Sequence, residues 1–163
     1  MRVAEVNRDY LSILGESLNK KVKILDEIIR LNAIQLESVS GQQIDDDSFN
    51  QTIEEKDKYI KEIEELDKGF ETVYEHIKEE LMVNRTQYSK EISQLKEMIA
   101  KITEKSMEVK LSEKRNEQAV YKKISEERQK IHKSKTTNKV ATDYYKNMNK
   151  MSFVDPQFVD KKN

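Results

Sequence analysis

Residues 11–39 read LSILGESLNKKVKILDEIIRLNAIQLESV and predict a long amphipathic helix. Apolar residues recur here at steps of three and four, the spacing that keeps side chains on one stripe of a helix. The expected stripe consists of Leu11, Leu14, Leu18, Val22, Leu25, Ile29, Asn32, Leu36 and Val39. Asn7 is the candidate N-cap, and Gly41 suits the left-handed position that ends a helix. A first helix over about 7–39 is therefore expected.

Two further helices are expected, at about 48–83 and about 85–133, because both segments repeat the three-four spacing. The second stripe has Lys56 in one seam position and consists otherwise of Phe49, Ile53, Ile60, Ile63, Leu66, Phe70, Val73, Ile77 and Leu81. The third stripe consists of Tyr88, Ile92, Leu95, Ile99, Ile102 and Val109. The polar residues 42–47 separate the first two helices, and Ser48 begins a capping box for the second helix. Asn84 supplies a capping signal for the third helix. A continuous helix through this point is the alternative, because neither Gly nor Pro lies there.

Composition favours an all-α fold. Charged residues make up 37% of the 163 residues and hydrophobic ones 36%, with 3 Gly, 1 Pro and no Cys. So little turn-forming sequence and so few apolar residues suit long helices with narrow seams better than a thick core. We expect one domain over residues 1–133, an elongated antiparallel helical hairpin or three-helix coiled-coil-like bundle. A short amphipathic helix over 137–151 and a mobile tail over 152–163 should follow it.

The helical stripe becomes half polar beyond Val109, where seam positions bring Glu113 and Asn116. Large apolar residues in segments too polar to form their own core are typical of partner surfaces. The candidate partner-binding residues on this basis are Ala119, Val120, Ile124, Ile131, Tyr144 and Met148. The alternative is that these residues pack back on the first two helices.

The sequence gives no support to catalysis, to a metal or to a cofactor. His76 and His132 lie far apart without ligand spacing, and Asp45–Asp47 lacks the remaining pattern of a calcium loop. We expect a protein that is not an enzyme. The absence of cysteine and of an apolar run of about 20 residues favours a cytoplasmic location without membrane insertion.

Charge is unevenly distributed, with a net charge of −8 over residues 1–109 and of +7 over 110–163. A basic segment of this kind would be suited to nucleic acid or to an acidic protein. The sequence pI of about 6.2, and the acidic residues interleaved among the lysines, argue against nucleic acid. The basic surface around Lys123 is therefore expected to meet an acidic protein partner.

Two short motifs resemble a known family. Residues 53–56 read IEEK ahead of an apolar repeat, and residues 102–105 read ITEK ahead of Arg115-Asn116. Both are similar to stretches of flagellar export chaperones of the FlgN type, with the FliT type as a near relative in architecture. The family tail, in contrast, often contains glycine, whereas Tyr144-Tyr145 continues a helical pattern here.

The resemblance implies a cytoplasmic chaperone of flagellar type III export. Such a protein holds the C-terminal segments of hook-associated (hook-filament junction) or filament-cap proteins and delivers them to the export gate, a further partner. Neither nucleotide nor metal would be used. Family substrate contacts map onto Asn116, Val120, Ile124 and Ile131.

Two hypotheses of mechanism follow. The late third helix would pair with an amphipathic helix of the client, and residues 137–151 would fold back over the same face in the free protein. The competing function is a coiled-coil scaffold that self-associates through its stripes. For a chaperone we expect a monomer or a weak homodimer.

Overall fold

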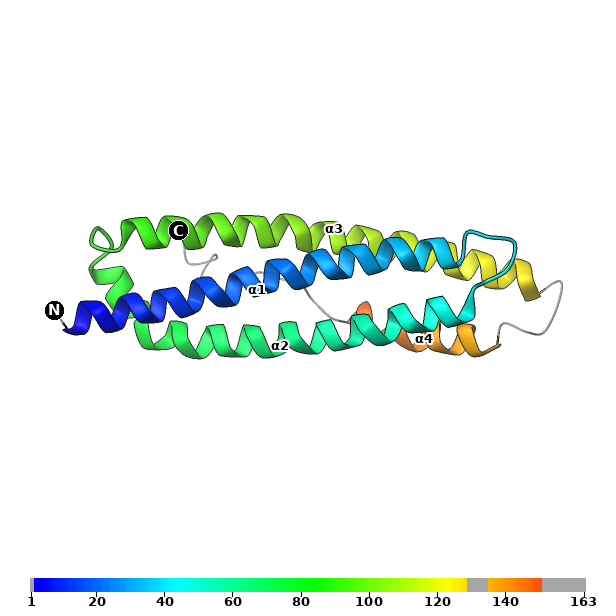
Figure 1. Ribbon diagram of the computed structural model, residues 1–163, viewed down its shortest axis with the longest axis horizontal. Coiled ribbons are helices and arrows are strands. Elements are labelled where there is room, and N and C mark those ends of the chain that lie inside the picture. Colours follow the sequence, from blue (N-terminus) through cyan, green and yellow to red (C-terminus); the bar gives the residue numbers. More distant parts are fainter. Residues whose placement is uncertain (1, 129–134, 151–163) are drawn as a thin grey trace. The chain divides into compact units, whose positions relative to one another are not determined.

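A computed structural model describes residues 2–128 and 135–150 of the chain. All regular structure in these ranges is helical, which confirms the predicted all-α class (Figure 1). The helices are α1 (Arg2–Ser38), α2 (Asp46–Val83), α3 (Ser89–Arg128) and the short α4 (Lys135–Met148). The predicted tail over 152–163 lies outside the described residues.

The first helix begins upstream of its predicted cap. Asn7 lies inside α1 and is buried, and its amide donates a hydrogen bond of 3.2 Å to the Tyr88 hydroxyl. The prediction that Asn7 is the N-cap is therefore wrong, because this side chain makes a tertiary contact instead. The cap of α2 also differs, since Asp45 Oδ1 accepts the backbone N–H of Ser48 at 3.2 Å. Asp45, just before the helix, takes the capping role expected of Ser48.

The break between the second and third helices is confirmed. After α2 ends at Val83, the Asn84 carbonyl accepts the Gln87 N–H at 3.1 Å in a turn, and α3 begins at Ser89. The alternative of one continuous helix is therefore wrong. At its other end α3 is described to Arg128, and the rest of the predicted 85–133 helix lies outside the described residues.

The tertiary contacts group the chain into two compact units. Among the described residues, the first unit contains 2–25 and 61–105, and the second contains 26–60, 106–128 and 135–150. The helices α1, α2 and α3 each contribute to both units. The single domain expected over 1–133 stays a prediction.

In the first unit, apolar side chains of α1, α2 and α3 meet in a common core. Its buried residues include Leu11, Leu14, Leu18, Ile63, Phe70, Ile77, Leu81, Leu95, Ile99 and Ile102. These are largely the predicted stripe positions, so the three-four spacing identified the core-facing side of each helix. Lys21 is the charged exception: its side chain is only 2% exposed, and its ammonium lies 2.9 Å from Asp67 Oδ1.

In the second unit, the same three helices are joined by α4. Its buried apolar residues include Ile28, Leu31, Val39, Ile44, Phe49, Ile53, Val109, Val120 and Ile124. The Ile44 N–H donates to Glu127 Oε1 at 2.7 Å and ties the α1–α2 connector to α3. Figure 1 shows α4 lying alongside the first turns of α2, where Thr137 hydrogen-bonds to Asp46.

The buried stripe of α1 rotates slightly relative to the prediction. Val22, Ile29 and Leu36 were expected in the seam but are only half-buried. Lys21, Ile28 and Gln35, each one residue earlier, are buried instead. The buried stripe positions keep the strict heptad spacing, with alternating steps of three and four residues, so Lys21 and Gln35 occupy seam positions beside the apolar Val22 and Leu36. They are Leu11, Leu14, Leu18, Lys21, Leu25, Ile28, Asn32, Gln35 and Val39.

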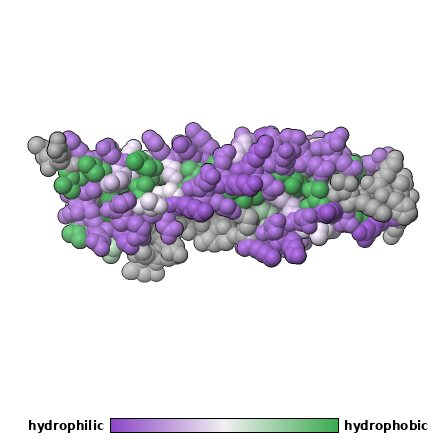
Figure 2. Space-filling model, turned by 90° about the horizontal axis from the view of Figure 1, so that it is seen from below, coloured by the Kyte–Doolittle hydropathy of each residue, from purple (hydrophilic) through white to green (hydrophobic). Residues whose placement is uncertain are grey.

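Hydrophilic residues dominate the surface seen in Figure 2, and hydrophobic residues appear there as separate small patches. The large apolar residues that remain exposed within the described ranges are Val3, Val6, Ile13, Met82, Val83, Met107 and Leu111. No described helix combines the length and the apolar character needed to cross a membrane.

Candidate partner-binding site

The predicted partner-binding residues that the structure describes lie in the second unit, and most of them are buried. The exposed fraction is 8% or less for Asn116, Val120, Ile124, Tyr144 and Met148. Ala119 and Lys123 are half-buried, and Ile131 lies outside the described residues. The face is therefore covered in this structure and offers little free surface to a partner.

The cover is α4. Its Tyr145 ring lies 6.0 Å from the Tyr121 ring of α3, centroid to centroid, and packs edge-on against Tyr144 at 5.0 Å. Ala141, on the same side of α4, is fully buried. The late part of α3 thus packs against a helix of the same chain, as the hypothesis of a folded-back segment expected.

A group of buried polar side chains lies beneath this contact. We call it the polar cluster and define it as Asn32, Gln35, Lys56, Glu113 and Asn116. The Lys56 side chain is 0% exposed, and its ammonium donates to Asn32 Oδ1 at 2.7 Å, to Gln35 Oε1 at 3.1 Å and to Glu113 Oε1 at 2.9 Å. The Asn116 amide donates to the Asn32 carbonyl at 2.8 Å and to Gln35 Oε1 at 2.9 Å. Helices α1, α2 and α3 are therefore joined by a buried ion pair and its hydrogen bonds.

Two tyrosines of α4 complete the polar cluster. The Tyr144 hydroxyl donates to Glu113 Oε1 at 2.7 Å, and the ring of Tyr144 lies 4.3 Å from the Lys56 ammonium, a cation–π contact. The Tyr145 hydroxyl donates to Gln35 Oε1 at 3.3 Å. Docking of α4 thus depends on polar complementarity as well as on apolar area.

Burial dominates the electrostatics of the cluster. Desolvation lowers the pKa of Lys56, and the nearby Glu113 carboxylate partly opposes this effect. Burial raises the pKa of Tyr144, with the charge of Glu113 as the next cause, and raises the pKa of Tyr145 for the same reasons. At neutral pH both tyrosines therefore keep the protons that they donate. Glu113 Oε2, in contrast, is buried and accepts no hydrogen bond from the described residues.

No family model, curated protein or solved structure matches this chain. The resemblance to flagellar export chaperones therefore stays a prediction from the two sequence motifs.

Sequence reasoning placed Lys56 and Glu113 at seam positions but assigned neither a role in the site. The available signal was a lysine and a glutamate, each interrupting an apolar stripe on a different helix. Charged side chains are almost never fully buried unless they are paired, so opposite charges at seam positions indicate a buried ion pair. Gln35 gave no such signal, because the expected stripe contained Leu36 instead.

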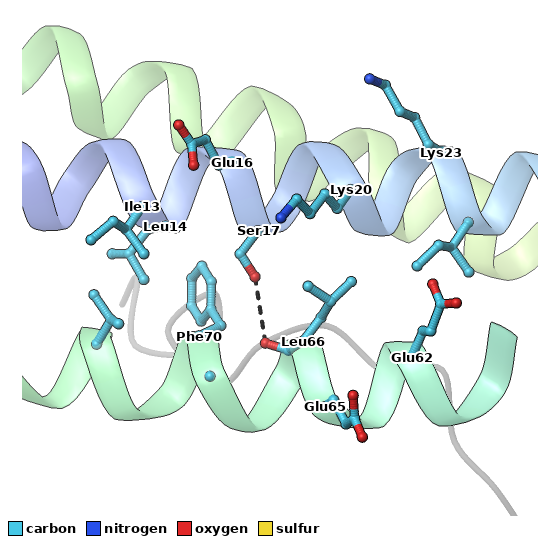
Figure 3. A pocket seen from close by; sticks show the side chains of 13 residues that line it. Ile13, Leu14, Glu16, Ser17, Lys20, Lys23, Glu62, Glu65, Leu66 and Phe70 are labelled. Atoms are coloured by element: carbon cyan, nitrogen blue, oxygen red, sulfur yellow. Dashed lines mark hydrogen bonds between the residues drawn. The ribbon is translucent and has the colours of Figure 1, made fainter. Parts of the chain in front are cut away.

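A separate pocket of about 560 Å³ lies between α1 and α2 in the first unit (Figure 3). Its apolar lining includes Ile13, Leu14, Leu66 and Phe70, and charged residues of both helices surround it. The Ser17 hydroxyl donates to the Leu66 carbonyl across the two helices at 3.4 Å. The described residues contain no group of three or more His, Cys, Asp and Glu side chains that could hold a metal.

Proposed function

We propose that the protein is a flagellar export chaperone that binds an amphipathic helix of its client on the late part of α3. The C-terminal segments of hook-associated or filament-cap proteins are the proposed clients. The observation that carries the proposal is that this face already holds a helix, α4, through an apolar and polar contact that another helix could reproduce.

A helix of 14 residues is well suited to be a displaceable cover. Isolated helices of this length are marginal in water, so α4 owes its helicity to docking. Release of α4 would expose Val120 and Ile124 together with the polar cluster. A client helix that contributes more contact area would then replace it, at a cost equal to the docking free energy of α4.

Charge around the face favours an acidic client. On α3 itself, Lys122 is exposed and Lys123 is half-buried, next to the buried Ile124 of the face. Such a surface raises the rate of encounter with an acidic segment and adds to specificity.

Calorimetric titration of purified C-terminal segments of hook-associated proteins tests the proposal. The full chain is compared with Ala141→Asp, which places a charge in the buried contact of α4. Release of α4 should lower Kd for the client by at least about 10-fold, because the client no longer competes with it. The matched control is Ala33→Asp, at an exposed position of α1 in the same unit, and should leave Kd unchanged. Failure of every candidate client to bind either form would refute the proposed function.

The scaffold alternative requires stripes that are free to pair between chains. Residues such as Leu31, Phe49 and Val109 are instead buried within the second unit, which favours packing inside one chain. Sedimentation velocity over a wide concentration range separates the two functions. A stable oligomer formed without any client would support the scaffold.

A further inference from the structure

The contact with α4 carries information about what the face recognises. Resting on the proposed function, we infer that the polar cluster selects its partner: an incoming helix must carry a tyrosine that covers Lys56 and donates its hydroxyl hydrogen to Glu113. The partner is then an amphipathic protein helix with an aromatic pair in the pattern small-x-x-Tyr-aromatic-x-x-Met.

The pattern is taken from the buried side of α4. Ala141, Tyr144, Tyr145 and Met148 are all buried, and they follow the spacing i, i+3, i+4 and i+7 of one helix face. Ala141 is 0% exposed, so a larger residue at its position would collide with the face. A helix that replaces α4 therefore needs a small residue at the position of Ala141 and polar groups that can hydrogen-bond to the polar cluster.

The main demand comes from Glu113. With α4 docked, its Oε1 atom accepts hydrogen bonds from Lys56 and Tyr144, whereas its buried Oε2 has no partner among the described residues. An apolar helix would cover the carboxylate again but would remove the Tyr144 hydrogen bond. Loss of a hydrogen bond to a buried charge weakens binding by about 10- to 100-fold.

Lys56 adds a second demand. Its ammonium is fully buried under the Tyr144 ring, and a partner with leucine at this position would cover the cation with a side chain that has no π-face. Gln35 discriminates less strongly between tyrosine and phenylalanine at the position of Tyr145, because Asn116 continues to donate to the Gln35 oxygen when the Tyr145 hydroxyl is absent. The first tyrosine of the pair is therefore the specificity-determining position, and the second tolerates phenylalanine.

The first arm of the test uses α4 as its own probe. A fluorescein-labelled peptide of residues 135–150 is titrated, by fluorescence anisotropy, against the full-length Ala141→Asp protein. Amide exchange over 135–148 verifies that α4 is released, and Met148→Asp serves as a second variant for this purpose. The unmodified peptide should bind, Tyr144→Phe should weaken binding about 10-fold and Tyr144→Leu about 100-fold. The control Asn147→Ala changes an exposed residue and should bind like the parent.

A matched pair of protein variants provides the reciprocal test. Glu113→Gln should reduce the preference for the tyrosine peptide over the Tyr144→Phe peptide to about threefold or less, because a neutral amide is the weaker acceptor. Glu108→Gln, at an exposed position of α3, should keep the full preference. Equal binding of the tyrosine, phenylalanine and leucine peptides would overturn the inference.

Selection of a displayed library of helical peptides on the Ala141→Asp protein tests the tyrosine requirement separately from the proposed helix-binding function. Enrichment of tyrosine at the position that faces Lys56 supports the inference. Selected helices that bind the face without tyrosine overturn it and leave the proposed function standing. If neither the library nor the 135–150 peptide binds, the face is not a helix-binding site, and both proposals fall.

Discussion

Replacement of Lys56 by methionine should reduce the free energy of unfolding by about 3–5 kcal/mol, the range for breaking a buried ion pair by removing one partner. The magnitude follows from burial, since the Lys56 and Glu113 side chains are 0% and 8% exposed. In Lys56→Met the Glu113 carboxylate would remain buried with only the Tyr144 hydroxyl as donor, and Asn32 Oδ1 would lose its hydrogen bond from Lys56.

The double variant Lys56→Met/Glu113→Met should regain most of this loss. A buried ion pair contributes little net stability relative to apolar residues of similar volume, because desolvation offsets the attraction. The lowered pKa of Lys56 has the same cause. The two substitutions should therefore be strongly non-additive, and the double variant should lose less stability than Lys56→Met alone.

Urea unfolding followed by circular dichroism measures all four members of this cycle. Lys58→Met, at an exposed position of α2, is the matched control and should change the free energy of unfolding by less than about 0.5 kcal/mol. A loss below about 1 kcal/mol for Lys56→Met, or additive losses in the double variant, would refute the reasoning that the pair is buried and coupled.

Three further predictions concern stability. Because burial raises the pKa of Tyr144 and Tyr145, the folded protein holds these protons more tightly. Their stabilising contribution is complete below about pH 10 and should fall above it by up to about 1.4 kcal/mol per pH unit for each tyrosine. Tyr145→Phe should reduce this alkaline slope in urea unfolding, and an unchanged slope would contradict the assignment. Asp67→Ala should cost about 1–3 kcal/mol, because it leaves the buried Lys21 ammonium without its partner. The double variant with Lys21→Met should recover stability, and a further loss would argue against this ion pair. Gly69→Ala should raise the thermal midpoint through a gain of about 0.5–1 kcal/mol, since nothing lies within 4 Å of the added Cβ. A lower midpoint would show that the position needs glycine.

The sequence was sufficient to determine the helices and the side of each that faces the core. Leu14, Phe70 and Ile99 were identified by spacing alone and are buried. The chain breaks near Gly41 and Asn84 were also predictable. Local spacing and composition decide these features, and both can be read within one segment of the chain. The individual capping residues were predicted wrongly, since Asn7 lies inside α1 and Asp45 caps α2. Likewise, α3 begins at Ser89 and not next to Asn84, and Gly41 does not adopt a positive φ.

Tertiary structure alone decided the candidate site. Sequence spacing marked the late part of α3 as poorly filled, because Glu113 and Asn116 interrupt its stripe. In the fold the same residues are buried, because Lys56 from α2 lies at their level and Tyr144 from α4 covers them. The connectors and the rotation of each helix about its axis decide which residues of different helices lie opposite one another. Spacing within one helix contains no information about either, so a half-polar stripe looks the same whether it faces water, a partner or a buried counter-ion.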